Sequence, residues 1–438
     1  MKLIYQVEDK VKFGPLLVFA IQQLLAIMTA TLVVPIIVGN GMSSAAALFG
    51  AGCGTLVYIL FTARKSPVFL GSSFAFIGSM CAAFAGGVSV SLGYLGLIIG
   101  AVFAGLVYVV IALVVKFAGV KWIDKLMPPV IIGPTVAIIG LSLAGNAIGD
   151  LMTPSVEGGS VYVCLICGLV TLFVTVIAST YGKNMIKLIP FIIGILAGYA
   201  VAAVFTVIGN ATGNPALQII NFGLFASMTW VPDFTFLTAA KGINQLDAGY
   251  IATIAVAYIP VAFVVFAEHI ADHKNLGSIV GVNLLEDPGL HRTLLGDGIG
   301  SFLGAVFGGC PNTTYGESIG CVAISGNASV ITILYTAILA MLISFFGPFA
   351  TFLATIPSCV MGGVCIALYG FIAVSGLKMI QGVDLNKNRN LFVVSIILIA
   401  GVGGMSVSFG SVTITEVACA LILGILTNVM LSKEDPNK

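Results

Sequence analysis

Charged side chains are scarce in this sequence of 438 residues. Asp, Glu, Lys and Arg make up 8% of it, and only three histidines and two tryptophans are present. An average soluble domain is about a quarter charged and under half apolar, whereas 59% of this chain is hydrophobic. The net charge of +1 indicates neither a nucleic acid nor an acidic partner. A soluble domain of ordinary composition is therefore excluded.

The opening residues do not predict a cleavable leader either. Residues 1–13 carry several charges before the first apolar run, and no small-residue cleavage site follows soon after. We therefore expect the first membrane segment to be retained.

Cysteines do not form a recognisable framework. Most of the nine lie inside apolar runs, where a free cysteine behaves as a small hydrophobe. Cys164 and Cys167 have the spacing of a redox pair, but no second pair, histidine cluster or soluble fold surrounds them. We expect free thiols.

What the sequence does contain is long apolar runs, such as residues 160–178, each long enough to cross about 30 Å of hydrocarbon as a helix. They predict an all-α polytopic membrane protein with about fourteen spans, the third, tenth and thirteenth being short or polar for complete helices. Only 209–248 is long enough for an extramembrane element. The expected spans are 14–37, 43–63, 68–84, 92–117, 128–148, 160–179, 186–208, 249–273, 291–308, 312–327, 329–347, 355–377, 390–404 and 411–432.

The distribution of Lys and Arg predicts the orientation. Cytoplasmic loops carry the excess of these residues, and with the N-terminus inside only Lys241 of the eighteen falls on the outer side. Both termini are therefore expected in the cytoplasm.

A weak internal repeat relates the first seven spans to the last seven. Spans 5 and 12 carry proline and three glycines in the same order (Pro129, Gly133, Gly140, Gly145 and Pro357, Gly362, Gly370, Gly376). Because seven is odd, the second copy would enter from the opposite side, as in the inverted repeats of secondary transporters, whose substrates bind near interrupted helices. Coincidental spacing is the alternative, since both residue types are frequent in membrane helices.

Acidic residues deep in apolar runs are informative, because a charge at the bilayer centre costs several kcal/mol unless paired or hydrated. Glu268 follows a nearly apolar stretch and opens a dense ionisable cluster, with Asp272 one turn later on the same face. His269 and His273 share another face, but no third metal ligand accompanies them. A solvated helix end is the alternative for Asp272 and His273; for Glu268 we favour a functional role.

A second cluster, residues 310–320, separates two apolar runs. Its opening is polar, β-branched and aromatic, which predicts an extended stretch leading into a short helix. Such backbone is tolerated at membrane depth only beside protein or a water-filled cavity. The free N–H groups of the short helix would suit a carbonyl oxygen or an anion. Residues 72–76 repeat this arrangement, and an ordinary extracellular loop is the alternative.

Four motifs closely resemble the nucleobase/ascorbate transporter family (nucleobase:cation symporter-2), in particular its bacterial uracil permeases. They are residues 71–76, 267–270, 286–292 and 311–320. The resemblance covers essentially the whole chain. It implies fourteen spans in two inverted repeats, short antiparallel strands in spans 3 and 10, a homodimer, and a location in the bacterial inner membrane. It also implies a core domain (1–127 and 249–348) and a gate domain (128–248 and 349–438).

The resemblance also assigns site residues. It implies that Glu268 and Glu317 bind the base by side chain and that Phe74 and Gly316 offer backbone groups, while the pocket would be lined by Ala30, Tyr315 and Tyr369. Relatives selective for xanthine or urate commonly carry Gln near the position of Glu317, which favours uracil here. Some uracil permeases have a histidine where this chain has Asp272, so the proton-coupling network is expected to differ.

These assignments predict uracil import by proton symport through alternating access. Two nearby carboxylates in a low dielectric are not expected to be ionised together, so Glu268 is the leading proton carrier and Asp272 a relay. No cofactor or nucleic acid is expected; the expected partners are the base, the membrane lipid and a second copy of the chain, and sodium coupling stays open.

The alternatives are a purine or urate carrier on the same fold, a binding receptor, and an anion transporter of the related sulfate and bicarbonate family. That last family would be expected to show a basic residue where Glu317 stands. An enzyme is disfavoured, because no nucleophile with an adjacent base and no metal triad is evident.

Overall fold

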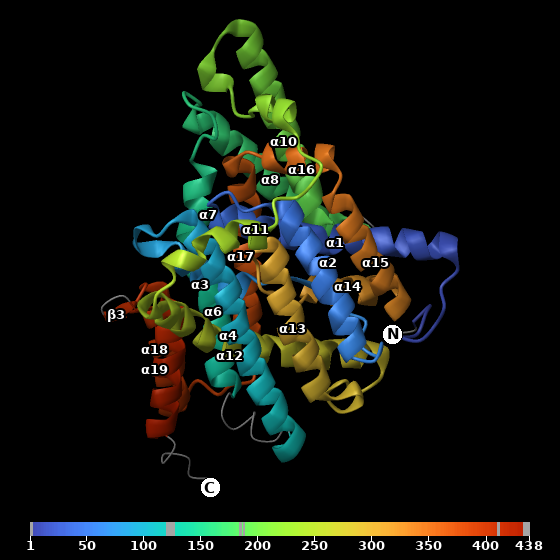
Figure 1. Cartoon of the computed structure of the whole chain (residues 1–438), viewed down its shortest axis with the longest axis vertical. Coiled ribbons are helices and arrows are strands. Elements are labelled where there is room, and N and C mark those ends of the chain that lie inside the picture. Colours follow the sequence, from blue (N-terminus) through green and yellow to red (C-terminus); the bar gives the residue numbers. More distant parts are fainter. Residues whose placement is uncertain (1–2, 120–127, 184–185, 187–188, 410–411, 432–438) are drawn as a thin grey trace.

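The computed structural model describes residues 3–119, 128–183, 186, 189–409 and 412–431 (Figure 1). Several lysines that contribute to the predicted orientation lie outside the described residues: Lys2, Lys121, Lys125, Lys187, Lys433 and Lys438.

Helices dominate the chain. The first half contains α1 (Phe13–Val38), α2 (Ser44–Phe61), α3 (Ile77–Ala83), α4 (Val90–Ala118), α6 (Pro129–Ser142), α7 (Ala144–Leu151), α8 (Val161–Tyr181) and α10 (Pro190–Thr212). The second half contains α11 (Thr235–Ala239), α12 (Ala248–Val280), α13 (Leu290–Gly308), α14 (Gly316–Ser325), α15 (Val330–Ser344), α16 (Gly347–Ala354), α17 (Ser358–Met379), α18 (Asn388–Val402) and α19 (Glu416–Met430). The described residues also contain four three-residue strands: β1 (Leu70–Ser72), β2 (Asn312–Thr314), β3 (Val407–Phe409) and β4 (Val412–Ile414).

The helices are those of an integral membrane protein. Among the described residues, eight helices are long and apolar enough to cross a bilayer, and α15 with α16, bent by 79°, makes a ninth if the pair is one span. The apolar helices at Phe74–Gly87, Asn388–Val402 and Glu416–Met430 are shorter than that. They correspond to spans 3, 13 and 14 of the sequence prediction.

Several boundaries differ from the sequence prediction, and three of them bear on the site and its surroundings. The span expected at 128–148 is divided at Leu143 into α6 and α7. The span expected to end at 273 continues to Val280, where Gly281 takes the left-handed conformation (φ 76°) that ends helices readily. The last span begins at Glu416 rather than 411, because β3 and β4 form an antiparallel hairpin before it.

Two sets of helices pack closely within themselves. In one set, α2 contacts α13 and α15, and α4 contacts α12 and α13. In the other, α17 contacts α6, α7 and α8, and α8 contacts α10. The helices α18 and α19 (red in Figure 1) lie side by side and contact α6.

Glycine permits close contact between α2 and α13. A Cβ atom on Gly54 would lie 2.7 Å from the carbonyl oxygen of Gly300, and one on Gly50 would lie 2.8 Å from that of Gly304. The backbones therefore touch directly, which is the usual packing of small residues in membrane helices.

The two interrupted segments meet in the middle of the protein. Strands β1 and β2 pair antiparallel, with Leu70 opposite Thr314 and Ser72 opposite Asn312, which confirms the predicted strands. The Asn312 side chain donates to the carbonyl oxygens of Gly50 (3.1 Å) and Gly300 (3.3 Å). This amide fixes β2 against α2 and α13.

A short strap at the beginning of the described chain, residues 4–9, is fastened to the loop between α14 and α15. The amide of Ile4 donates to Gly326 O (2.7 Å), and the amides of Ala328 and Val330 donate to Tyr5 O and Val7 O (both 3.0 Å). The strap thus holds the end of α14 in place.

Candidate functional site

A cavity of about 440 Å³ lies where α12, the β1–β2 pair, α6 and α17 meet. This volume falls in the usual range for small-molecule sites. The described residues that line it are Phe74, Ala75, Val136, Ile139, Phe191, Glu268, Ala271, Asp272, Thr313, Thr314, Tyr315, Gly316, Glu317, Leu368, Phe371, Ile372, Ser375 and Met379.

One wall of the cavity is acidic and polar, and we call it the polar wall: Glu268, Asp272, Thr313, Thr314 and Glu317. Glu268 and Asp272 are one turn apart on α12, so both side chains leave the same face. The Thr314 hydroxyl donates to Asp272 Oδ2 (2.7 Å). Glu268 and Glu317 form no hydrogen bond or ion pair with any other residue that the structure describes, so their carboxyl oxygens are available to a ligand.

Glu317 owes its position to the interrupted backbone. It lies in the first turn of α14, whose N-cap is Tyr315, and the free N–H groups of a helix N-terminus favour a carboxylate there. The Tyr315 hydroxyl donates to Ser72 O (2.7 Å), and its amide donates to Phe69 O (3.2 Å). These bonds join the start of α14 to the β1 segment.

The α14 helix is also anchored from behind. The buried Gln23 side chain of α1 donates to both the hydroxyl and the carbonyl of Ser318, and the Ser318 hydroxyl accepts from the Phe69 amide (3.0 Å). Consequently Ser318, the residue after Glu317, is hydrogen-bonded both to α1 and to the residue before β1.

The opposite wall is almost wholly apolar, and we call it the apolar wall: Val136, Ile139, Phe191, Leu368, Phe371, Ile372, Ser375 and Met379. The rings of Phe191 and Phe371 meet edge to face with centroids 6.0 Å apart. Ser375 is the one polar side chain among these residues.

The structure brings most of the predicted site residues together. Glu268, Asp272 and Glu317 line the cavity with Phe74, Tyr315 and Gly316. Their contacts with a ligand stay predictions.

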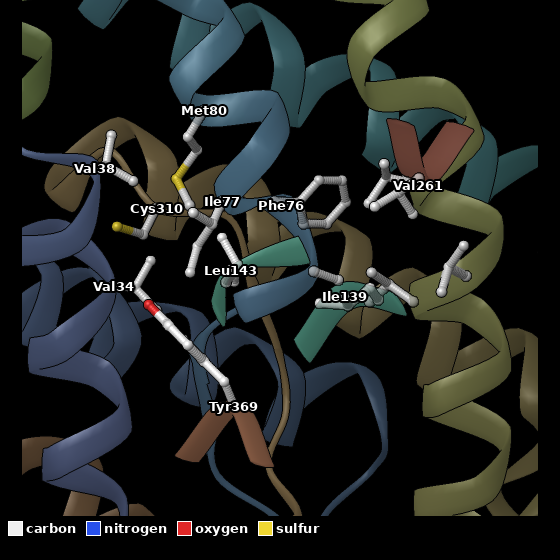
Figure 2. Close-up of a cluster of buried hydrophobic side chains, with 14 of the residues drawn as sticks. Val34, Val38, Phe76, Ile77, Met80, Ile139, Leu143, Val261, Cys310 and Tyr369 are labelled. Atoms are coloured by element: carbon white, nitrogen blue, oxygen red, sulfur yellow. The ribbon is translucent and has the colours of Figure 1, made fainter. Parts of the chain in front are cut away.

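Ala30 and Tyr369 are not among the lining residues. Ala30 is buried in the apolar cluster that contains Tyr315. Tyr369 lies in the larger cluster, with its hydroxyl end beside Val34 (Figure 2). Both stand behind the cavity surface, and their predicted contact with a base stays a prediction.

The two histidines of α12 do not converge on a common point. Their rings stack with centroids 4.0 Å apart. His273 Nδ1 donates to the carbonyl of His269 (2.7 Å), and its Nε2 contacts the Tyr58 hydroxyl (2.7 Å). His273 is only 1% exposed, and α12 continues for two further turns to Val280, so the alternative of a solvated helix end does not hold for His273.

Sequence analysis missed the partner of His269. Its Nδ1 lies 2.8 Å from Asp297 Oδ2 on α13, and both side chains are fully buried. The only sequence signal was an acid within the glycine-rich run 296–300, where the apolar context that drew attention to Glu268 is weaker.

Comparisons with known proteins support the membrane assignment. A family model, Xan_ur_permease, described as a permease family, matches residues 14–409. A uracil permease of Bacillus caldolyticus is 37% identical over 436 residues, covering 98% of this chain and 95% of that protein. A uracil permease of Escherichia coli strain K12 is 37% identical over 410 residues, covering 93% of this chain and 89% of that one.

Solved structures share the fold at much lower identity. The transmembrane domain of the cyanobacterial bicarbonate transporter BicA matches with a TM-score of 0.63 at 16% identity, covering 97% of this chain and all of that one. The murine anion transporter Slc26a9 matches with a TM-score of 0.64 at 13% identity, covering 97% of this chain and 69% of that one.

The match to the family model spans most of the chain, and the identity to curated relatives is high over nearly their whole length, which confirms the resemblance drawn from the sequence motifs. The chain belongs to this permease family and is a membrane transporter, not an enzyme.

Proposed function

We propose that this permease imports uracil. The observation that carries the proposal is a pair of glutamates, Glu268 and Glu317, which line one cavity of suitable volume and form no hydrogen bond or ion pair with another residue among those the structure describes. The uracil permeases that share 37% identity with the chain support the choice of base.

The polar wall is complementary to the edge of a pyrimidine base. Uracil offers two N–H donors and two carbonyl acceptors, so an ionised carboxylate can accept from an N–H. A protonated carboxyl or a backbone N–H can donate to a carbonyl. Glu268 and Glu317 supply the carboxyl groups, and the first turn of α14 supplies free N–H groups.

Transport would be coupled to protons. Two carboxyl groups beside one low-dielectric cavity are not both ionised easily, so one of them can carry a proton with the base, with Glu268 the leading carrier and Asp272 a relay. One proton crossing about 100 mV supplies roughly 2.3 kcal/mol, which corresponds to an almost fifty-fold gradient of a neutral solute. One proton per uracil therefore suffices.

The finer architecture belongs to the same proposal. Fourteen spans in two inverted repeats of seven would form a core domain (1–127 and 249–348) and a gate domain (128–248 and 349–438). The two sets of closely packed helices support this division. Movement of one set against the other would expose the cavity alternately to each side of a bacterial inner membrane, with both termini cytoplasmic and the protein a homodimer.

The decisive experiment is uptake of labelled uracil by proteoliposomes carrying Glu268→Gln or Glu317→Gln. We expect each variant to lose at least about tenfold in uptake, since a hydrogen bond to a charged group contributes about 1.5–3 kcal/mol. Glu157→Gln, an exposed glutamate between α7 and α8, is the matched control. Unchanged uptake in both cavity variants would contradict the site.

Three further measurements separate the alternatives. Competition of uracil uptake by xanthine, urate and thymine distinguishes a pyrimidine carrier from a purine carrier on the same fold. A pH jump applied with and without sodium identifies the coupling ion, and counterflow separates transport from binding alone.

A further inference from the structure

Behind the polar wall lies an ionisable pair that the proposed uracil site does not use. Asp297 and His269 are both completely buried, and Asp297 Oδ2 accepts from His269 Nδ1 over 2.8 Å. Within the described part of the chain, no lysine or arginine forms an ion pair with Asp297. Its carboxyl group therefore depends on a single imidazole for compensation, which is an expensive arrangement at membrane depth.

The pair is set back from the cavity by a single residue. Thr313 lines the cavity, and its hydroxyl lies close enough to the Asp297 carboxyl to interact with it. Asp297 Oδ1 and Thr313 Oγ1 are both buried, and neither forms a well-aligned hydrogen bond with another described residue. An open acceptor thus faces an open hydroxyl at the cavity wall.

The far end of the imidazole can accommodate either protonation state. His269 Nε2 lies 3.0 Å from the Thr293 hydroxyl, which also lies 3.1 Å from the carbonyl of Leu290. When Nε2 is bare, Thr293 donates to it. When Nε2 is protonated, it donates to Thr293, which then donates to Leu290 O. Nε2 therefore has a hydrogen-bond partner in either state, whereas Leu290 O receives the Thr293 proton only when Nε2 is protonated.

Other ionisable groups surround the pair and bear on its charge. These groups are Glu268, Asp272 and His273 of α12, Tyr58 of α2 and Tyr108 of α4. Glu317 of α14 interacts with Glu268 and Asp272 and so bears on the pair indirectly. The carboxyl groups outnumber the basic groups in this set, so neutralising one carboxylate makes it easier for another to be ionised.

We propose that the Asp297–His269 pair is a second proton-binding site, which receives the coupled proton from Glu268 across Thr313 while the base is bound. The proton leaves the Glu268 carboxyl and binds Asp297 Oδ1, so Glu268 becomes a carboxylate able to accept a uracil N–H and the pair becomes neutral. The total charge of the buried cluster does not change. This inference deepens the proposed proton symport and rests on it.

The test compares Asp297→Asn with wild type in proteoliposomes that contain a pH-sensitive dye. Asparagine can still accept from His269 Nδ1 but cannot take the proton. We expect counterflow of labelled uracil to stay within about threefold of wild type, while uphill accumulation and uracil-driven proton entry fall at least tenfold. A purely structural role for Asp297 would lower counterflow together with uphill uptake.

A second variant keeps the test valid if Asp297→Asn does not fold. Thr313→Val removes only the hydroxyl between the two sites, and we expect it to lower the ratio of protons to uracil at least fivefold. Thr336→Val, a buried threonine of α15 that bonds only to backbone carbonyls, is the control. The inference would be overturned if Asp297→Asn and Thr313→Val both kept the wild-type ratio of protons to uracil. Absence of uracil exchange in the wild-type protein would instead refute the proposed function.

Discussion

The polar wall and the apolar wall enclose the same cavity but differ in almost every chemical respect. The polar wall is built on interrupted backbone and on α12, and it carries three carboxyl groups and two hydroxyls. The apolar wall is built on continuous helix faces of α6, α10 and α17 and offers one hydroxyl. If the cavity binds uracil as we propose, the polar wall would bind the base by directional hydrogen bonds, and the apolar wall would close the cavity without holding a polar solute.

Placing a charge on the apolar wall should have the largest effect. Phe371→Asp would add a fourth carboxyl group to the cavity at membrane depth, where a charge costs about 2.5–3.5 kcal/mol. We expect uracil uptake to fall at least about a hundredfold. Phe371→Leu, which keeps the wall apolar, should stay within about threefold. Equal uptake by the two variants would show that this wall does not border the substrate.

Removing the hydroxyl that supports Asp272 should have the next largest effect. Thr314→Val abolishes the 2.7 Å bond to Asp272 Oδ2, and a hydrogen bond to a charged group is worth about 1.5–3 kcal/mol. Uptake should fall about tenfold or more. The control is Thr175→Val on α8, whose hydroxyl donates to a backbone carbonyl. If both variants lose uptake equally, the loss reflects stability and not the polar wall.

Loosening the start of α14 should have a smaller effect. Tyr315→Phe removes the hydrogen bond to Ser72 O, a neutral bond worth about 1 kcal/mol, so the KM for uracil should rise about fivefold with little change in the maximal rate. Initial-rate kinetics measure this. The control Tyr335→Phe replaces an exposed tyrosine of α15 and should leave KM unchanged. An equal rise of KM in this control would show that the hydrogen bond of Tyr315 is not what sets the KM.

The smallest effect is expected from Ser375→Ala. This serine is the one polar residue of the apolar wall, and if the wall only closes the cavity, KM should change less than about twofold. A rise above about fivefold would mean that α17 also binds the base by a hydrogen bond, and the contrast between the walls would have to be revised.

Sequence patterns predicted the polar wall better than the apolar wall. Glu268 and Glu317 stood out because acids are costly among apolar residues, and the unusual composition of residues 310–320 predicted the interrupted backbone. Most helices of the apolar wall show no such contrast, because every residue in them suits the membrane.

The rotational position of Tyr369 on α17 explains why it does not line the cavity as predicted. The wall residues of α17 follow one face at three- and four-residue steps: Leu368, Phe371, Ile372, Ser375 and Met379. Tyr369 is one position from that face, about 100° around the helix, and a motif resemblance does not resolve so small a rotation.

Contacts between side chains of different helices were the other feature that could not be predicted from the sequence. His269 was visible in the sequence, but Asp297 is 28 residues away, and only the packing of α12 beside α13 brings them together. The same holds for the β3–β4 hairpin, whose strands of three residues are too short for an alternating pattern to be recognised.

The strap of residues 4–9 has a practical consequence for protein engineering. Its amide and carbonyl groups are joined to residues 326–330, immediately after the helix that carries Glu317. An affinity tag or fluorescent protein fused before residue 4 would therefore lie next to the hydrogen bonds that hold the end of α14, and deletion of the first nine residues would remove those bonds.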